Sequence, residues 1–127
     1  MAESKKYGVI FLLGSIGYGA IEILWRGYTH WSMLLAGGVC FMIFLLINKV
    51  FFDSSLILRA FLCGTAVTCV EFFFGVLFNL ILKMNVWDYS TMPFNVLGQV
   101  CAEFYLMWIF LGLIFTPLAG ALDKLMS

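Results

Sequence analysis

Apolar and polar residues form long blocks along the chain, with four apolar runs separated by short polar segments. The runs cover about residues 7–25, 33–52, 56–82 and 96–122. A helix needs about 20 mostly apolar residues to cross the hydrocarbon core of a bilayer, and each run reaches that length. The pattern predicts an all-α, polytopic integral membrane protein whose four transmembrane helices form a single domain over residues 1–127.

Composition favours a bilayer over water as the solvent of this chain. Hydrophobic residues make up 64% of the sequence and charged residues 11%, whereas soluble domains average about 45–50% and about 25%. A short soluble chain could not bury so much apolar surface, because small domains hide only about two thirds of what the unfolded chain exposes. Acidic and basic side chains balance at seven each, so we expect no nucleic-acid partner.

The first run follows Lys5 and Lys6, a pattern that also occurs in secretory signal peptides. Glycines interrupt its apolar core, and the run ends in Glu22 and Arg26 without a small-residue cleavage site. We therefore expect a retained transmembrane helix.

Basic residues near the ends of the runs predict that both termini lie in the cytoplasm, since lysine and arginine concentrate on that side of a membrane. In this N-in/C-in orientation only Arg26 and Lys83 face outward. The cytoplasmic side would carry Lys5, Lys6, Lys49, Arg59 and Lys124. The two polar loops, "RGYTHWS" and "NVWDYSTMPFN", would then emerge together on the non-cytoplasmic side.

Three carboxylates lie within the predicted spans, at Glu22, Glu71 and Glu103. A charged side chain at membrane depth costs at least about 2.5–3.5 kcal/mol, so each needs a structural or functional reason. Glu22 and Arg26 are spaced i,i+4 and can pair on one helix face. Glu71 favours a functional reason most strongly, because no basic residue lies within two turns of it on its own helix.

Polar residues at helical spacing extend from these carboxylates toward the outer half of the bundle. Glu71, Gly75 and Asn79 are spaced i,i+4,i+8, and Gln99 and Glu103 are spaced i,i+4. One interpretation is that these groups only join helices, as polar contacts do in membranes. The other is a hydrated cavity, open to the outer face, that binds a polar or cationic small molecule.

Histidine and cysteine patterns offer no metal or cofactor site. His30 is the only histidine, and neither H-x-x-x-H nor a C-x-x-C pair occurs. The four cysteines lie in apolar runs and are expected to pack between helices. His30, Asp88 and Ser32 or Ser90 could be combined into a catalytic set, but no nucleophile elbow supports it. No catalytic residue, metal or cofactor is therefore assigned.

Aromatic residues gather at the predicted outer boundary of the bilayer. This position is typical of an interfacial aromatic belt. The residues are Trp25, Tyr28, Trp31, Trp87 and Tyr89. We interpret Trp25, Tyr28 and Trp31 mainly as such a belt.

The segment "WDYSTMPFNVLGQVC" at 87–101, with "GYGAIE" at 17–22 and Glu71, resembles the CmpB-like family of small membrane proteins described as ABC-transporter permeases. "EILWRGYTHWSM" at 22–33 is similar to the short bacterial branch of that family. The resemblance covers nearly the whole chain and implies a multi-pass protein of the bacterial cytoplasmic (inner) membrane. It points to the motif positions Glu22, Glu71, Trp87, Asp88, Tyr89, Ser90, Pro93, Asn95, Gly98 and Gln99.

The same motif has a structural interpretation. Asp88 and Ser90 can cap backbone amides at a turn, and Pro93 stiffens the chain that follows. Asn95 is expected to cap the N-terminus of the fourth helix, with Gln99 one turn inside it. An ordered outer loop could need these residues without binding anything.

The leading hypothesis is a small permease-like protein that binds or moves a polar or cationic solute through an outer-half cavity. The candidate ligand-binding residues are Glu22, Arg26, His30, Glu71, Asn79, Asp88, Asn95 and Gln99. The alternatives are a membrane-embedded enzyme acting on a lipid or amphiphile, and a structural subunit of a larger complex.

Partners are predicted from the size of the chain and from its connections. Four helices are few for a complete translocation path, so a homo-oligomer is expected. The sequence has no P-loop. The predicted cytoplasmic connection "FFDSS" offers no docking helix, so the chain itself gives no support for an ATP-binding partner subunit.

Overall fold

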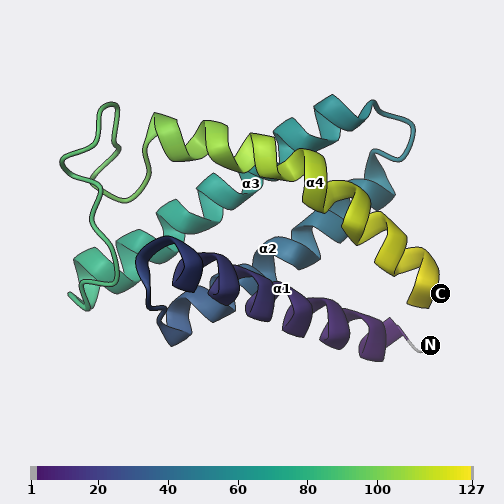
Figure 1. Cartoon of the computed structure of the whole chain (residues 1–127), viewed down its shortest axis with the longest axis horizontal. Helices are drawn as coiled ribbons and strands as arrows, with labels where there is room; N and C mark the ends of the chain where they lie inside the picture. The colour runs from purple at the N-terminus through teal and green to yellow at the C-terminus, as the bar shows by residue number, and fades with distance from the viewer. Residues whose placement is uncertain (1–2, 127) are drawn as a thin grey trace.

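The structure is a computed structural model that describes residues 3–126 as a bundle of long helices (Figure 1). The helices are α1 (Glu3–Arg26), α2 (Trp31–Val50), α3 (Leu56–Gly75) and α4 (Ala102–Met126). A short π-helical segment, η1 (Val76–Ile81), continues α3 directly. Four stretches in the described chain are long and apolar enough to cross a membrane, one of them spanning α3 and η1. The predicted all-α fold class with four membrane helices is confirmed.

The helices run alternately up and down, so that α1 packs along α2 and α3 packs along α4, while α2 also touches α3 and α4. The two chain ends lie at one end of the bundle, beside the α2–α3 connection (Figure 1). The α1–α2 turn and the long loop 82–101 lie at the opposite end. The two polar loops therefore share one end, as the sequence predicts, and the N-in/C-in orientation stays a prediction.

Local sequence signals explain where α1 ends and where α2 and α3 begin. Helix α1 ends at Arg26 because Gly27 adopts a φ of +85°, a left-handed conformation that glycine takes without steric cost. His30 caps α2 by accepting a hydrogen bond from the Ser32 amide at 3.2 Å. Ser55 caps α3 by accepting one from the Leu58 amide, also at 3.2 Å.

Helix α4 begins at Ala102, later than the predicted start near Val96. Leu97 and Gly98 have φ values of +55° and +73°, which a right-handed helix cannot include. The expected cap of α4 by Asn95, and the expected placing of Gln99 one turn inside the helix, are therefore wrong. Glu103 lies in the first turn of α4 and is exposed, so it shares no helix face with Gln99.

Glycines let the helix backbones approach closely within each pair. A Cβ added at Gly14 would lie 2.5 Å from the carbonyl oxygen of Gly37, and one added at Gly112 would lie 2.9 Å from that of Ala60. Small residues at such crossings are the usual basis of helix packing in membranes. The α1–α2 and α3–α4 pairs are therefore fixed by backbone proximity.

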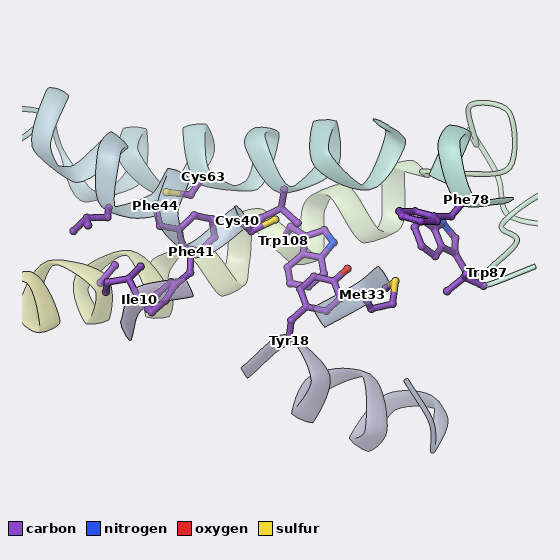
Figure 2. Packing of buried hydrophobic residues seen from close by; sticks show 14 of the residues in the cluster. Ile10, Tyr18, Met33, Cys40, Phe41, Phe44, Cys63, Phe78, Trp87 and Trp108 are labelled. Carbon is purple, nitrogen blue, oxygen red and sulfur yellow. The ribbon is translucent and has the colours of Figure 1, made fainter. Parts of the chain in front are cut away.

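A mostly aromatic and aliphatic core lies between the two helix pairs (Figure 2). It includes Ile10, Tyr18, Phe41, Phe44 and Trp108. All four cysteines are free thiols, and all but the exposed Cys69 are buried. The prediction that cysteines pack between helices therefore holds for Cys40, Cys63 and Cys101.

Polar contacts join the helices at the end where the chain termini lie. The Lys6 ammonium pairs with the Asp123 carboxylate at 2.7 Å and so links α1 to α4. The Asn48 side chain donates to the carbonyl oxygen of Thr116 at 2.9 Å and accepts from Arg59, also at 2.9 Å. Helices α1 and α4 are thus tied together at this end.

Candidate functional site

Glu71 lies in the middle of the bundle, where three helices meet. Its side chain is 3% exposed. The carboxylate oxygen Oε1 accepts hydrogen bonds from the Tyr18 hydroxyl on α1 and from the Trp108 indole on α4, the latter at 3.1 Å. Within residues 3–126, no basic side chain forms an ion pair with Glu71. A buried carboxylate without a basic partner is costly when it is ionised, and a proton or a bound cation removes that cost.

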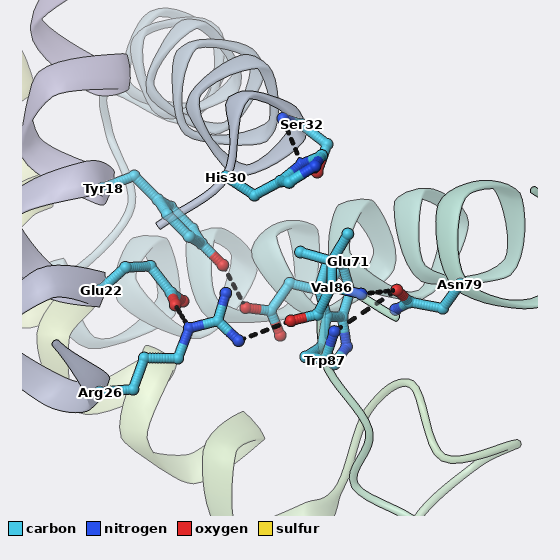
Figure 3. A network of polar contacts seen from close by, with 9 residues as sticks. All are labelled: Tyr18, Glu22, Arg26, His30, Ser32, Glu71, Asn79, Val86 and Trp87. Carbon is cyan, nitrogen blue, oxygen red and sulfur yellow. Dashed lines mark hydrogen bonds and ion pairs between the residues drawn. The ribbon is translucent and has the colours of Figure 1, made fainter. Parts of the chain in front are cut away.

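Glu22 and Arg26 form the ion pair that their i,i+4 spacing predicts, with Arg26 Nε 2.7 Å from Glu22 Oε2. Both side chains are largely buried. Arg26 Nη1 also donates to the carbonyl oxygen of Val86 at 2.7 Å, which fastens the loop 82–101 to α1 (Figure 3). The positive charge of Arg26 is therefore matched by Glu22, and Glu71 keeps an unmatched negative charge when it is ionised.

A cavity of about 290 Å³, which we call the carboxylate cavity, adjoins both glutamates. Its walls come from α1, α3, α4 and the loop 82–101. Besides Glu22 and Glu71 it is lined by Ile21, Leu24, Trp25, Tyr89, Phe104, Met107, Trp108 and Leu111. Aromatic faces attract cations through their negative quadrupole. Carboxylates and aromatic rings together form a wall suited to a cationic group.

The aromatic rings of this wall support one another. The Phe104 ring lies edge-on to the Trp25 ring, with centroids 5.9 Å apart. The centroid of the Phe104 ring also lies 4.9 Å from that of the Tyr89 ring. Burial raises the pKa of Tyr89, so its phenol stays a neutral hydroxyl. The loop thus contributes an uncharged polar group to the carboxylate cavity.

Asn79 and Gln99 are buried but bind the loop rather than the carboxylate cavity. Asn79 Nδ2 donates to Gln99 Oε1 at 2.8 Å, and Asn79 Oδ1 accepts from the Val86 amide at 2.7 Å. The indole of Trp87 donates to the carbonyl oxygen of Gln99 at 2.9 Å. Gly75 makes room for this arrangement, since a Cβ there would lie 2.5 Å from Gln99 Oε1. Glu71, Gly75 and Asn79 are all buried, so the predicted stripe forms one buried helix face. Asn79, at the outer end of this face, binds the loop 82–101 through its hydrogen bond with the Val86 amide.

Replacing Asn79 with alanine should therefore loosen this loop. The Val86 amide and the Gln99 side chain would lose buried partners, and each unsatisfied group costs about 1–3 kcal/mol. We expect a clear fall in the unfolding temperature, measured through tryptophan fluorescence of the purified protein. Asn95→Ala is the matched control and should cost less, because the Asn95 bonds lie in a more exposed turn. Equal stability of Asn79→Ala and the wild type would contradict the assigned role.

Asp88 and Asn95 shape the outer loop through local hydrogen bonds. Asp88 Oδ1 accepts from the Ser90 amide at 2.9 Å, as the structural interpretation of the motif predicts. Asn95 donates to the carbonyl oxygen of Met92 at 2.8 Å and accepts from the Gly98 amide at 3.0 Å. Position 98 favours glycine for two reasons. Its φ is positive, and a Cβ there would lie 2.9 Å from Asp88 Oδ1. Neither Asp88 nor Asn95 lines the carboxylate cavity.

A family comparison covers nearly the whole chain. The sequence model of the family described as "Putative ABC-transporter type IV", ABC_trans_CmpB, matches residues 9–124. The chain belongs to this family. The resemblance seen in the sequence is therefore confirmed, and the protein is a multi-pass membrane protein of a transporter family. No curated protein and no solved structure matches the chain significantly.

In this member of the ABC_trans_CmpB family, His30 is the N-cap residue of α2. Its Nδ1 lies 2.8 Å from Ser32 Oγ and accepts from the Ser32 amide. Within residues 3–126 no hydrogen bond joins His30 to Asp88, so the catalytic set considered from the sequence is not assembled. His30 also does not line the carboxylate cavity.

The structure brings Glu22, Arg26 and Glu71 together and adds residues that sequence reasoning left out. Tyr18 and Trp108 hold the Glu71 carboxylate, and neither was a candidate. A signal existed for Tyr18, because Tyr18, Glu22 and Arg26 are spaced i,i+4,i+8 on one face of α1. No comparable pattern identifies Trp108, whose contact with Glu71 joins two different helices.

Proposed function

We propose that this protein is a small permease-like component of a bacterial cytoplasmic membrane that binds a cationic small solute in the carboxylate cavity. The observation that carries the proposal is the buried Glu71 carboxylate, which faces this cavity without a basic partner among the described residues. The transporter family of the chain supports a role in solute handling. Glu71 is the deepest contact of the solute in this proposal.

Electrostatics favour a cation over a neutral or anionic solute. Glu22 and Arg26 neutralise each other, so an ionised Glu71 leaves the site with net negative charge. Such a charge is costly in a poorly solvated site unless it is paired, and a bound cation supplies the pair. The rings of Trp25 and Phe104 beside the carboxylates favour an organic ammonium over a small hydrated metal ion, because ring faces replace water poorly for the latter.

The proposal places the cavity in the outer half of the membrane, with both termini in the cytoplasm. The loop 82–101 and the α1–α2 turn would then face the outside, and the solute would enter from there. A homo-oligomer would supply the further helices that a complete path needs. An ATP-binding partner is no part of the proposal, because the connection between α2 and α3 is a short turn at residues 51–55.

Titration with tetramethylammonium chloride tests the proposal on the purified protein in lipid nanodiscs. Tryptophan fluorescence reports binding, since Trp25 and Trp108 line the carboxylate cavity. Glu71→Gln should weaken binding at least about tenfold, equal to about 1.4 kcal/mol. The amide keeps an oxygen acceptor for Tyr18 and Trp108, so the near-UV circular dichroism spectrum should stay unchanged.

Glu103→Gln is the matched control, because it removes an exposed carboxylate on α4 outside the cavity. It should bind tetramethylammonium as the wild type does, and sodium chloride at equal ionic strength should give no saturable signal. The proposal fails if the wild type does not bind the cation, or if Glu71→Gln binds it equally well. In that case the interpretation of the polar groups as helix contacts is favoured.

A further inference from the structure

A second cavity of about 340 Å³ adjoins the carboxylate cavity. We call it the apolar cavity. Its walls are almost entirely aliphatic and aromatic and come from all four helices. They comprise Leu13, Gly14, Gly17, Tyr18, Ile21, Gly37, Cys40, Phe41, Phe44, Val67, Trp108, Phe115, Leu118 and Leu122. Figure 2 shows Tyr18, Trp108, Phe41 and Phe44 around this region.

The apolar cavity opens sideways between α1 and α4. Leu13 on α1 and Leu118 on α4 are 39% and 45% exposed, and both lie inside membrane-spanning helices, where exposed side chains face lipid. The opening is bounded at one end by the ion pair of Lys6 and Asp123, which joins α1 to α4. At the other end the rings of Trp25 and Phe104 bring the same two helices together. The apolar cavity is therefore open to the hydrocarbon interior of the bilayer between α1 and α4.

The two cavities adjoin between α1 and α4, and Glu71 lines the carboxylate cavity but not the apolar cavity. Tyr18 and Trp108 stack with their ring centroids 5.4 Å apart and an interplanar angle of 24°. Both donate a hydrogen bond to Glu71 Oε1. Trp108 and Ile21 line both cavities. A ligand with a charged head beside Glu71 therefore has an apolar space next to it for a hydrocarbon chain.

From this juxtaposition we infer that the solute is an amphiphilic cation, with an ammonium-type head in the carboxylate cavity and a single hydrocarbon chain in the apolar cavity. This inference rests on the proposed function and names the class of its solute. A purely hydrophilic cation would leave the apolar cavity without a role in binding. A neutral lipid chain would leave the Glu71 carboxylate unpaired. The amphiphilic cation satisfies both features at once.

Chain length alone is a poor test, because the bilayer attracts hydrocarbon chains as strongly as an apolar protein wall does. A variant that fills the apolar cavity distinguishes the two. Gly17 lines this cavity, and a Cβ added there meets nothing within 4 Å. Gly17→Leu should therefore occupy the cavity without disturbing helix packing. Gly8→Leu is the matched control, since Gly8 lies on the same helix, has equal free space and lies outside both cavities.

The experiment measures binding of decyltrimethylammonium and of tetramethylammonium to the wild type, Gly17→Leu and Gly8→Leu in nanodiscs. We expect Gly17→Leu to weaken binding of the decyl compound at least about tenfold relative to Gly8→Leu in the same lipid. Binding of tetramethylammonium should stay within about twofold in all three proteins. Circular dichroism melting of each variant verifies that it is folded.

The outcomes separate the inference from the proposed function on which it rests. If Gly17→Leu weakens both cations equally, or neither, the amphiphilic solute is ruled out while a Glu71-dependent cation site stands. If a diazirine at the chain end of the decyl probe labels lipid-facing residues such as Ile16 or Phe73 instead of Phe41 or Phe44, the inference is also overturned. If neither cation binds in a Glu71-dependent way, the proposed function itself fails.

Discussion

Arg26→Leu is expected to destabilise the protein by about 3–5 kcal/mol, the usual cost of removing one partner of a buried ion pair. The Glu22 carboxylate, now without its partner at 2.7 Å, would be left beside the buried Glu71. The carbonyl oxygen of Val86 would lose its donor as well. The free energy of unfolding, measured by sodium dodecyl sulfate titration in mixed micelles, checks this value.

A second variant identifies the cause of that loss. Combining Arg26→Leu with Glu22→Leu removes both charges of the pair and should recover most of the lost stability, because no uncompensated charge remains at that position. The wild type, Arg26→Leu, Glu22→Leu and the double variant form a double-mutant cycle, and we expect a coupling energy of about 2 kcal/mol or more. A single variant within about 1 kcal/mol of the wild type would show that the pair contributes little.

Gly37→Leu should abolish the close packing of α1 on α2. A Cβ at Gly37 would overlap the Cβ of Tyr18 and would lie 2.6 Å from the carbonyl oxygen of Gly14. Neither group can move without shifting the α1 backbone, so the cost should reach or exceed the upper end of the about 1–3 kcal/mol range for overpacked cores. We expect a large fall in the melting temperature or no recoverable monodisperse protein by size-exclusion chromatography.

The Gly37 result also concerns the site, because the displaced residue Tyr18 holds the Glu71 carboxylate. Gly37→Ala should be milder in degree but should still weaken cation binding by moving Tyr18. Gly8→Leu adds the same leucine side chain to α1 where space is free and should leave the melting temperature nearly unchanged. If Gly37→Leu melts as the wild type does, the tight α1–α2 crossing is wrong.

Sequence reasoning located the helices well because membrane spans depend on length and apolarity, which the sequence states directly. It placed the start of α4 too early because residues 96–101 are mostly apolar and fit a helix as well as a turn. Whether this segment is helical depends on residues outside it. Trp87 and Asn79 bind Gln99, and together with the left-handed Leu97 and Gly98 they hold this segment outside the helix.

Only part of the candidate site was predicted from the sequence, because some of its contacts are local and others join distant segments. The Glu22–Arg26 pair is local, so its spacing was sufficient to identify it. The bonds of Glu71 to Tyr18 and Trp108 join three helices, and their partners depend on how the helices pack. Asn79 and Gln99 extend toward the outer loop as expected, but they satisfy each other and the loop. Sequence spacing identifies a polar face, whereas its contacts are decided by packing.

The π-helical segment Val76–Ile81 has a consequence for insertions and deletions in this family. A π-helical turn holds about one residue more than an α-helical turn, so removing one residue between Gly75 and Asn79 would let the helix continue as an α-helix with Asn79 still on the face of Glu71. Glu71 precedes the segment and would keep its place against Tyr18. A relative one residue shorter here would thus keep both the buried carboxylate and the contact of Asn79 with the loop 82–101, so that such a deletion leaves the site intact.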